Sequence, residues 1–400
     1  MSFELKALKD ICTIQIGKTP SRHENDYWRD GTHAWLSIAD MNQGRYLNNT
    51  KECITDLGVK ASNIKLIPKN TLVLSYKLSI GKVGITQKPM YTNEAIASLT
   101  ELDSQVDINY LYWALQHIDL LENADRAAMG KTLNKAKLSE VKIPLPPLAE
   151  QRRIASILDQ ADDLRQKRQQ AIEKLDQLLQ ATFIDMFGDP IDNLKGLETV
   201  ALLDLCKKVT DGTHQSPKWT TEGIPFLFIS NIVDGEIDYS SQKFIDQVTY
   251  DSLTKSTKIE LNDILYTTVG SYGNVARVKS NQLFCFQRHI AHIKPNFDKV
   301  NPKFLEKMLS SYGVRRQADR LVRGVAQKTL NLKDLKEIIV FNISLDEQNY
   351  FVQKCEVIES LKIKSKLALN QADDLFKSLQ NQAFNGTSFE NLRYKDSYEI

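Results

Sequence analysis

The 400-residue chain carries the same sequence pattern twice, and this repeat limits the possible folds most strongly. Residues 131–134 (Lys-Thr-Leu-Asn) recur 197 positions later as residues 328–331, and Glu150-Gln151 recurs as Glu347-Gln348. Solenoid repeats run to about 20–50 residues, so a period this long indicates two copies of a domain together with its connector. The sequence therefore predicts a tandem duplication.

The match extends upstream of these segments with small gaps. Residues 35–41 (WLSIADM) resemble residues 226–232 (FLFISNI), and Gly81-Lys82-Val83 resembles Gly273-Asn274-Val275. The length of the chain also exceeds what one hydrophobic core usually organises. We therefore expect two similar globular domains.

Each copy ends in a stretch without glycine or proline, at residues 150–187 and 347–384. Apolar residues recur there every three or four positions, as in a helix with one buried stripe. At ~1.5 Å per residue each helix would be about 57 Å long. The predicted packing positions are Ile154, Ile157, Ala161, Leu164, Leu175 and Leu178 in the first helix, and Val352, Cys355, Ile358, Leu375 and Leu379 in the second.

Two helices this long cannot each wrap a globular core, so we expect them to pack against each other as a coiled coil. Because domain and helix repeat in the same order, an approximate two-fold axis would make the pair antiparallel. The alternative is that each stripe packs only on its own domain.

The globular halves, residues 1–145 and 199–342, mix short alternating segments with loops and are predicted to be α/β or α+β domains. The helical spacers cover residues 146–188 and 344–385, and a tail covers residues 386–400. Strands are expected at residues 70–76, 83–86, 95–100, 225–229, 263–268 and 289–293, and helices at residues 110–122 and 302–312.

The chain shows no sign of a membrane or secretory location. No apolar run approaches the ~20 residues of a membrane helix, and the N-terminus lacks the pattern of a secretory signal. The five cysteines are scattered. We therefore expect a cytoplasmic protein.

Basic residues cluster before each predicted spacer. The second copy contributes Arg315, Arg316, Arg323 and Lys328, and the first contributes Arg126 and Lys131, beside Thr132. A local excess of cations suits the phosphate backbone of DNA, whatever the base sequence. A solvated basic face is the alternative interpretation.

Two matching glycine-containing loops join strand candidates and differ in their chemistry. The first offers Lys77, Ser79 and Lys82, and the second offers Ser271, Tyr272 and Asn274. Polar loops of this kind could reach base edges in a groove of DNA. Residues 37–42 and 230–234 form a second such pair, although ordinary turns would explain all four loops.

The sequence predicts no catalytic residue, metal site or cofactor site. Gly-Lys-Thr occurs at residues 17–19 and 130–132, but neither triplet has the earlier glycine of a phosphate-binding loop. His289 and His292 are spaced as metal ligands can be, but no second pair of ligands lies near them.

The proline-rich segment before the first helix, residues 143–151 (IPLPPLAEQ), and the repeated Leu-x-Glu-Gln resemble the specificity subunits of Type I restriction-modification enzymes. The second junction departs from the pattern, with residues 340–344 (VFNIS) in place of the prolines. The resemblance covers nearly the whole chain. It implies two target-recognition domains, each followed by a helical spacer.

The resemblance further implies a bipartite double-stranded DNA target, with one half read by each domain. It implies two modification subunits, which bind S-adenosylmethionine and methylate adenine. Restriction subunits would use ATP and Mg to translocate and cleave DNA. Two other hypotheses remain: a free-standing DNA-binding regulator without enzymatic partners, and a methyltransferase with a divergent motif.

Overall fold

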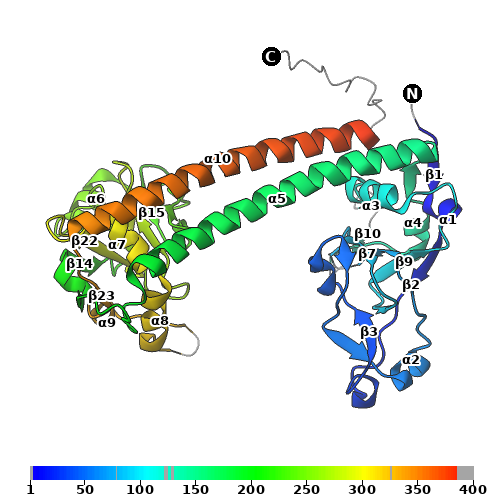
Figure 1. Cartoon of the computed structure of the whole chain (residues 1–400), viewed down its shortest axis with the longest axis horizontal. Coiled ribbons are helices and arrows are strands. Elements are labelled where there is room, and N and C mark those ends of the chain that lie inside the picture. The colour runs from blue at the N-terminus through cyan, green and yellow to red at the C-terminus, as the bar shows by residue number, and fades with distance from the viewer. Residues whose placement is uncertain (1–2, 78, 121–124, 128–129, 325–326, 385–400) are drawn as a thin grey trace, which may run out of the picture. The chain divides into compact units, whose positions relative to one another are not determined.

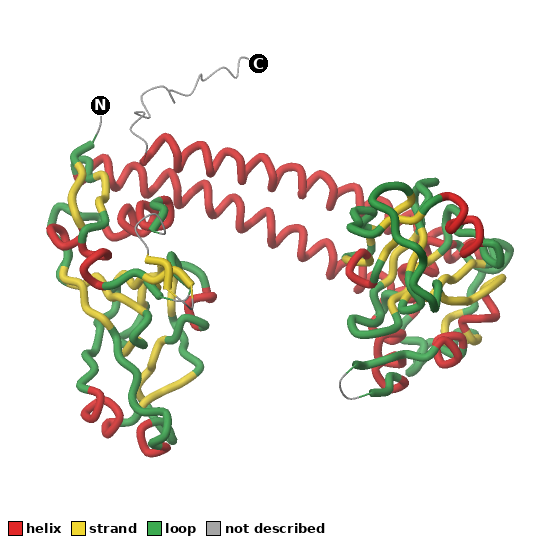
Figure 2. The backbone as a smooth tube through the Cα atoms, turned by 180° about the vertical axis from the view of Figure 1, so that it is seen from behind, coloured by secondary structure: helices red, strands yellow, loops and turns green. Residues whose placement is uncertain are grey.

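The computed structural model describes residues 3–77, 79–120, 125–127, 130–324 and 327–384, and the chain divides into two units. Unit 1 comprises Met1–Arg168 and Leu367–Ile400, and unit 2 comprises Gln169–Lys366. Each unit therefore contains one globular half and a part of both long helices. Helices and strands are mixed in both units, as the sequence predicts (Figure 2).

The globular part of unit 1 is built from short strands and short helices. Its strands are β1 (Leu5–Ala7), β2 (Thr13–Ile16), β3 (His33–Leu36), β4 (Tyr46–Leu47), β5 (Glu52–Ile54), β6 (Leu72–Ser75), β7 (Val83–Thr86), β8 (Tyr91–Thr92), β9 (Ile96–Thr100), β10 (Asp125–Ala127), β11 (Gly130–Thr132) and β12 (Lys142–Pro144). Its helices are α1 (Leu8–Ile11), α2 (Asp56–Ser62), α3 (Ile108–His117) and α4 (Lys135–Ser139), with 3-10 turns η1 (Asn25–Tyr27) and η2 (Asp40–Gln43).

The globular part of unit 2 has a similar composition. Its strands are β13 (Thr199–Ala201), β14 (Cys206–Asp211), β15 (Ile224–Leu227), β16 (Ile232–Val233), β17 (Glu236–Ile237), β18 (Phe244–Ile245), β19 (Ile264–Thr267), β20 (Val275–Arg277), β21 (Cys285–Phe286), β22 (Ile290–Pro295) and β23 (Ile339–Phe341). Its helices are α6 (Gln247–Thr254), α7 (Pro302–Leu309), α8 (Tyr312–Leu321) and α9 (Leu332–Lys336), with 3-10 turns η3 (Leu202–Leu205) and η4 (Ile229–Asn231).

The strand order confirms the duplication. In unit 1 the main sheet runs β2-β9-β6-β7-β4 and a smaller one runs β5-β3-β8. In unit 2 the corresponding sheets run β14-β22-β19-β20 and β18-β15-β21. The smaller sheets share a parallel pair, β3 with β8 and β15 with β21, although their other pairs are antiparallel.

The two predicted spacers are the long helices α5 (Leu148–Phe187) and α10 (Leu345–Phe384), which are labelled in Figure 1. Each begins two residues earlier than the sequence pattern indicated. None of the helices within the described ranges is long and apolar enough to cross a membrane.

Each long helix contributes to the cores of both units. In unit 1, Ile154 and Leu158 of α5 share a core with Leu379 and Ala383 of α10. In unit 2, Phe183 and Phe187 of α5 share a core with Phe351 and Cys355 of α10. The helices are antiparallel within each unit, because residues later in α5 pack with residues earlier in α10. The alternative, in which each helix packs only on its own domain, is wrong.

Most of the predicted packing positions are buried or partly buried. Ile154, Val352, Cys355, Ile358 and Leu379 are buried, and Ile157, Ala161 and Leu175 are partly buried. Leu164, Leu178 and Leu375 are instead 40%, 48% and 50% exposed, so their assignment to the stripe was wrong.

The neighbours of these exposed leucines take the packing position instead. Arg165 donates to Asp373 across the helix pair of unit 1 at 2.6 Å, and its guanidinium lies 4.5 Å from the centre of the Phe376 ring. Leu179 packs on the core of unit 2. Periodicity alone cannot show that an arginine, paired with a carboxylate, occupies the interface between two helices.

The repeated glutamine at the start of each long helix is a buried polar anchor. Gln151 accepts from the amide of Asp107 at 2.9 Å and donates to the carbonyls of Gln105 and Pro146, both at 2.8 Å. Gln348 accepts from the amide of Asn301 at 2.7 Å and donates to Lys299 and Ile343. Buried backbone groups need such partners, which explains why a glutamine recurs here.

Three predicted elements end two or more residues earlier than expected. The strand expected at residues 225–229 ends at Leu227, where η4 follows from Ile229. The helix expected at residues 110–122 ends at His117. The helix expected at residues 302–312 ends at Leu309, and Ser311 caps a second helix, α8, through its side chain.

Candidate nucleic-acid interface

One short turn in each unit joins three loops through backbone hydrogen bonds. In unit 1 the turn is residues 92–95: Lys18 donates to Thr92 at 2.9 Å, Asn93 to Leu36 at 3.0 Å, and Tyr76 to Ala95 at 3.0 Å. The turn therefore fixes the loops that follow β2, β3 and β6. We call residues 17–24, 37–42, 76–77, 79–82 and 92–95 the loop face of unit 1.

Unit 2 repeats this arrangement at residues 286–289. Arg288 donates to Thr213 at 3.0 Å, Gln287 to Leu227 at 3.2 Å, and Thr268 to His289 at 2.9 Å. Its loop face comprises residues 212–220, 228–234, 268–274 and 286–289. The two loop faces thus share one backbone frame, although their side chains differ.

The two glycine-containing loops predicted from the sequence adopt the same turn. The hydroxyls of Ser75 and Thr267 accept from the amides of Lys82 and Asn274, both at 2.9 Å. Gly81 and Gly273 have φ of +94° and +85°, a region that favours glycine. The loops join β6 to β7 and β19 to β20, as expected.

Lys82 and Asn274 tie this loop to its neighbour. The Lys82 ammonium donates to the side chain of Asn42 at 2.6 Å, and the side-chain amide of Asn274 donates to the carbonyl of Ile232 at 3.0 Å. The two pairs of loops that the sequence singled out separately are therefore in contact within each unit.

Among the other predicted loop residues, Ser79 and Ser271 are exposed and Lys77 is half-buried. Tyr272 differs, because the residue is only 6% exposed and its hydroxyl donates to Asp319 at 2.8 Å. Its prediction as a free contact residue is therefore corrected: Tyr272 holds the loop in place.

Arg315 and Arg316 also have partners within unit 2. Arg315 stacks 4.3 Å from the Tyr272 ring centre, donates to the Tyr272 carbonyl and pairs with Asp319 at 3.0 Å. Arg316 pairs with Asp192 at 2.7 Å and Asp189 at 3.4 Å. Substituting either arginine would disturb the fold as well as any contact with phosphate.

Lys328 and Arg323 are better placed to meet a phosphate. Both are exposed, and the side chain of Arg323 is 74% accessible with only a distant 3.7 Å pairing to Asp334. The backbone carbonyl of Lys328 accepts from the amide of Gly270, which places this segment beside the loop face. The side chains of Arg126, Lys131 and Thr132 lie outside the described residues, although their backbone forms the hairpin β10–β11.

Sequence reasoning missed the central turn itself. Glu94 and Arg288 are exposed at its equivalent positions. Aligning the two copies could have revealed this turn, because the alignment places a charged residue just before the matching strands β9 and β22.

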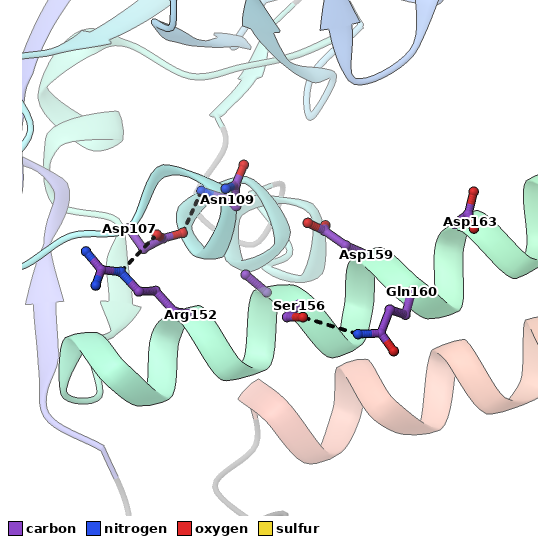
Figure 3. Close-up of a pocket in the computed structure, with 8 residues that line it drawn as sticks. Asp107, Asn109, Arg152, Ser156, Asp159, Gln160 and Asp163 are labelled. Atoms are coloured by element: carbon purple, nitrogen blue, oxygen red, sulfur yellow. Dashed lines mark hydrogen bonds and ion pairs between the residues drawn. The ribbon is translucent and has the colours of Figure 1, made fainter.

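A separate cavity of about 370 Å³ lies in unit 1 between α3 and α5 (Figure 3). Its acidic lining includes Asp107, Asp159 and Asp163, with Arg152 at one side. Asp159 accepts from the indole of Trp113 at 2.7 Å and pairs with Arg45. A wall of carboxylates would repel phosphate, so this cavity is not part of the candidate interface.

His292 lies in a buried charge network rather than in a metal site. Its ring nitrogen meets Asp263 at 2.6 Å, and Lys294 donates to the same carboxylate at 2.8 Å. Burial opposes ionisation of Asp263, but the hydrogen bonds from His292 and Lys294 hold its pKa below the usual value. Within the described residues there is no cluster of potential metal ligands.

This network predicts a pH-dependent stability. Since the folded-state pKa of Asp263 is lowered, its contribution is present above the unfolded pKa of ~3.9 and is lost as pH falls through the folded value. Replacing Asp263 with asparagine should cost about 2 kcal/mol at pH 7. Denaturant unfolding from pH 7 to pH 2 should show this difference shrinking only below about pH 4. A constant difference would contradict the role of the carboxylate charge.

Residues 2–174 match the family described as "Type I restriction modification DNA specificity domain". The chain is 28% identical over 330 residues to the EcoBI specificity subunit of Escherichia coli, which covers 75% of this chain and 69% of that protein. It is 29% identical over 269 residues to the MjaIX specificity subunit of Methanocaldococcus jannaschii, which covers 62% and 61% respectively. Both relatives are Type I restriction enzyme specificity subunits.

Two solved structures share the fold. One is the S subunit of a Type I restriction-modification system from M. genitalium, with a TM-score of 0.51 and 17% identity over 96% of each chain. The other comes from work on complex assembly and conformational transition of the type I R-M system. It has a TM-score of 0.61 and 16% identity, and covers 96% of this chain and 98% of that one.

Proposed function

Because this chain is a relative of the Type I restriction-modification specificity subunits and carries their DNA specificity domain at residues 2–174, we propose that it reads a bipartite DNA target. Unit 1 reads one half of the target and unit 2 reads the other. The observation that carries the proposal is the pair of loop faces, which share one backbone frame and differ in side chains. One scaffold with two different surfaces suits two different half-sites.

The chain supplies recognition and a scaffold, and the chemistry belongs to partners. The modification subunits bind S-adenosylmethionine and methylate adenine, and the restriction subunits use ATP and Mg to cleave DNA. The long helices, which enter the cores of both units, provide the scaffold. We place the complex in the cytoplasm, where its DNA target lies.

Methylation of the host genome tests this proposal. Sequencing that detects N6-methyladenine should find a motif with two specified parts and an unspecified gap, and the motif should disappear when the gene is deleted. Replacing residues 1–145 with the equivalent segment of a related protein should change one part of the motif and leave the other. A motif that changed in both parts would contradict independent reading by the two units.

The regulator hypothesis predicts a different result on purification. A tagged chain isolated from its host should bring down large subunits in fixed proportion if it works in a restriction-modification complex. A chain that binds a two-part DNA site but purifies alone, in a host without motif methylation, would favour the regulator.

A further inference from the structure

The central turn of each loop face presents one charged side chain from an unusually well-fixed backbone. In unit 1 the carbonyl of Glu94 accepts from the Tyr76 hydroxyl at 2.9 Å, and the residues on either side of Glu94 are bonded to the loops after β3 and β6. In unit 2 the amide of Arg288 donates to Thr213, and both of its neighbours are likewise bonded. A side chain on such a frame can meet a ligand with little further loss of backbone entropy.

Both side chains keep terminal hydrogen-bonding atoms that can contact a ligand. The Glu94 carboxylate accepts from the Thr19 hydroxyl through one oxygen, Oε2. Arg288 places its Nε 3.4 Å from the ring nitrogen of His289, which leaves its two terminal nitrogens. Neither residue forms an ion pair within 4.0 Å with another described residue, although Glu94 is among the carboxylates whose charge raises the pKa of Arg22. Lys82, Arg315 and Arg316, by contrast, are bound by partners within their own unit.

The charges at these equivalent positions are opposite. In the major groove a carboxylate accepts from the N4 amino group of cytosine, whereas an arginine donates in bidentate fashion to O6 and N7 of guanine. A carboxylate facing a phosphate would be repelled, so Glu94 gains nothing from the DNA backbone. If the loop face meets DNA as proposed above, contact with a base is the favourable interaction open to the Glu94 carboxylate.

Resting on the proposed function, we infer that Glu94 and Arg288 are base-reading residues, one for each half of the target. Glu94 selects cytosine in the half read by unit 1. Arg288 selects guanine in the half read by unit 2. Glu94 and Arg288 stand at equivalent positions but carry opposite charges. The two half-sites therefore have different bases at this position.

Substitution by glutamine gives a sharp test, because glutamine pairs in bidentate fashion with N6 and N7 of adenine. Glu94→Gln should change one cytosine of the motif to adenine, and Arg288→Gln should change one guanine of the other half to adenine. Arg288→Ala should only relax that guanine. Each change should shift the preference at one base pair by about ten- to a hundred-fold.

The measurement uses the complex purified from its host through a tag on this chain, with randomised duplex DNA as the probe and sequencing of the bound pool. Two matched controls retain the fold and remove the same charge elsewhere. Glu101→Gln alters an exposed glutamate that accepts from Thr13 at 2.8 Å beyond the other end of β9. Arg320→Ala alters an exposed arginine on α8 of unit 2. Neither control should change the preferred base at any position.

The outcomes separate the inference from the proposed function. A wild-type complex that selects no two-part motif would overturn the proposed function and the inference with it. A clear wild-type motif that stays unchanged in Glu94→Gln and Arg288→Gln would overturn the inference alone. An equal loss of affinity for all sequences in Arg288→Ala, with a shallower salt dependence, would show a phosphate contact and would also overturn it for Arg288.

Discussion

Replacing Gln151 with leucine should lower the free energy of unfolding of unit 1 by about 4 kcal/mol. The leucine leaves the Asp107 amide and the carbonyls of Gln105 and Pro146 without their partner. Each buried polar group that loses its partner costs about 1–3 kcal/mol. Gln151 itself has 0% exposure, so water cannot take its place without opening the structure.

Denaturant unfolding combined with hydrogen exchange would measure this loss and locate it in the chain. The matched control is Gln160→Leu, an exposed glutamine on the same helix, which should change stability by less than ~0.5 kcal/mol. Gln348→Leu should produce the same loss in unit 2, because that glutamine makes the equivalent three bonds. A loss below 1 kcal/mol for both variants would contradict the anchor role.

A second large effect is expected when Phe183 is replaced by alanine. Its ring lies 5.3 Å from that of Phe187, 5.5 Å from Phe351 and 6.1 Å from Phe304, measured between ring centres. Removing a buried phenylalanine costs about 3–5 kcal/mol, through lost burial and the cavity left behind. We therefore expect unit 2 to lose most of its margin of stability.

Ile184→Ala provides the control for this variant, because Ile184 is the next residue on α5 and is 52% exposed. Thermal and denaturant unfolding should show a small change for Ile184→Ala and a loss several times larger for Phe183→Ala. Hydrogen exchange should increase across unit 2 in the Phe183 variant. Equal losses for both variants would mean that the end of α5 contributes little to that core.

The repeat and the long helices could be predicted because their signals are local or internal to the sequence. A stretch without glycine or proline and a period near 3.6 specify a helix, whatever it packs against. The exposed Leu164 shows the limit, because periodicity treated it as a packing residue while Arg165 beside it occupies the seam. The partner of an arginine lies far away in sequence, here at Asp373, and no local pattern shows it.

The candidate interface was predictable in its loops but less so in its side chains. Gly81 and Gly273 marked the matching turns correctly, since the backbone there needs glycine. Tyr272 and Arg315 looked like free contact residues, yet they bind each other and Asp319. Whether a polar side chain is free depends on tertiary contacts, so the sequence could identify the loops and not which of their residues are available.

The shared cores also set the order in which this protein can mature during synthesis. The core of unit 1 includes Phe376, Leu379 and Ala383, which follow the first part of α5 by roughly 200 residues. At about 5–20 residues per second, the ribosome needs ~10–40 s to make that intervening stretch. During this interval the apolar surface around Trp113 and Tyr110 lacks Phe376 and Phe384, whose rings pack against it in the folded chain.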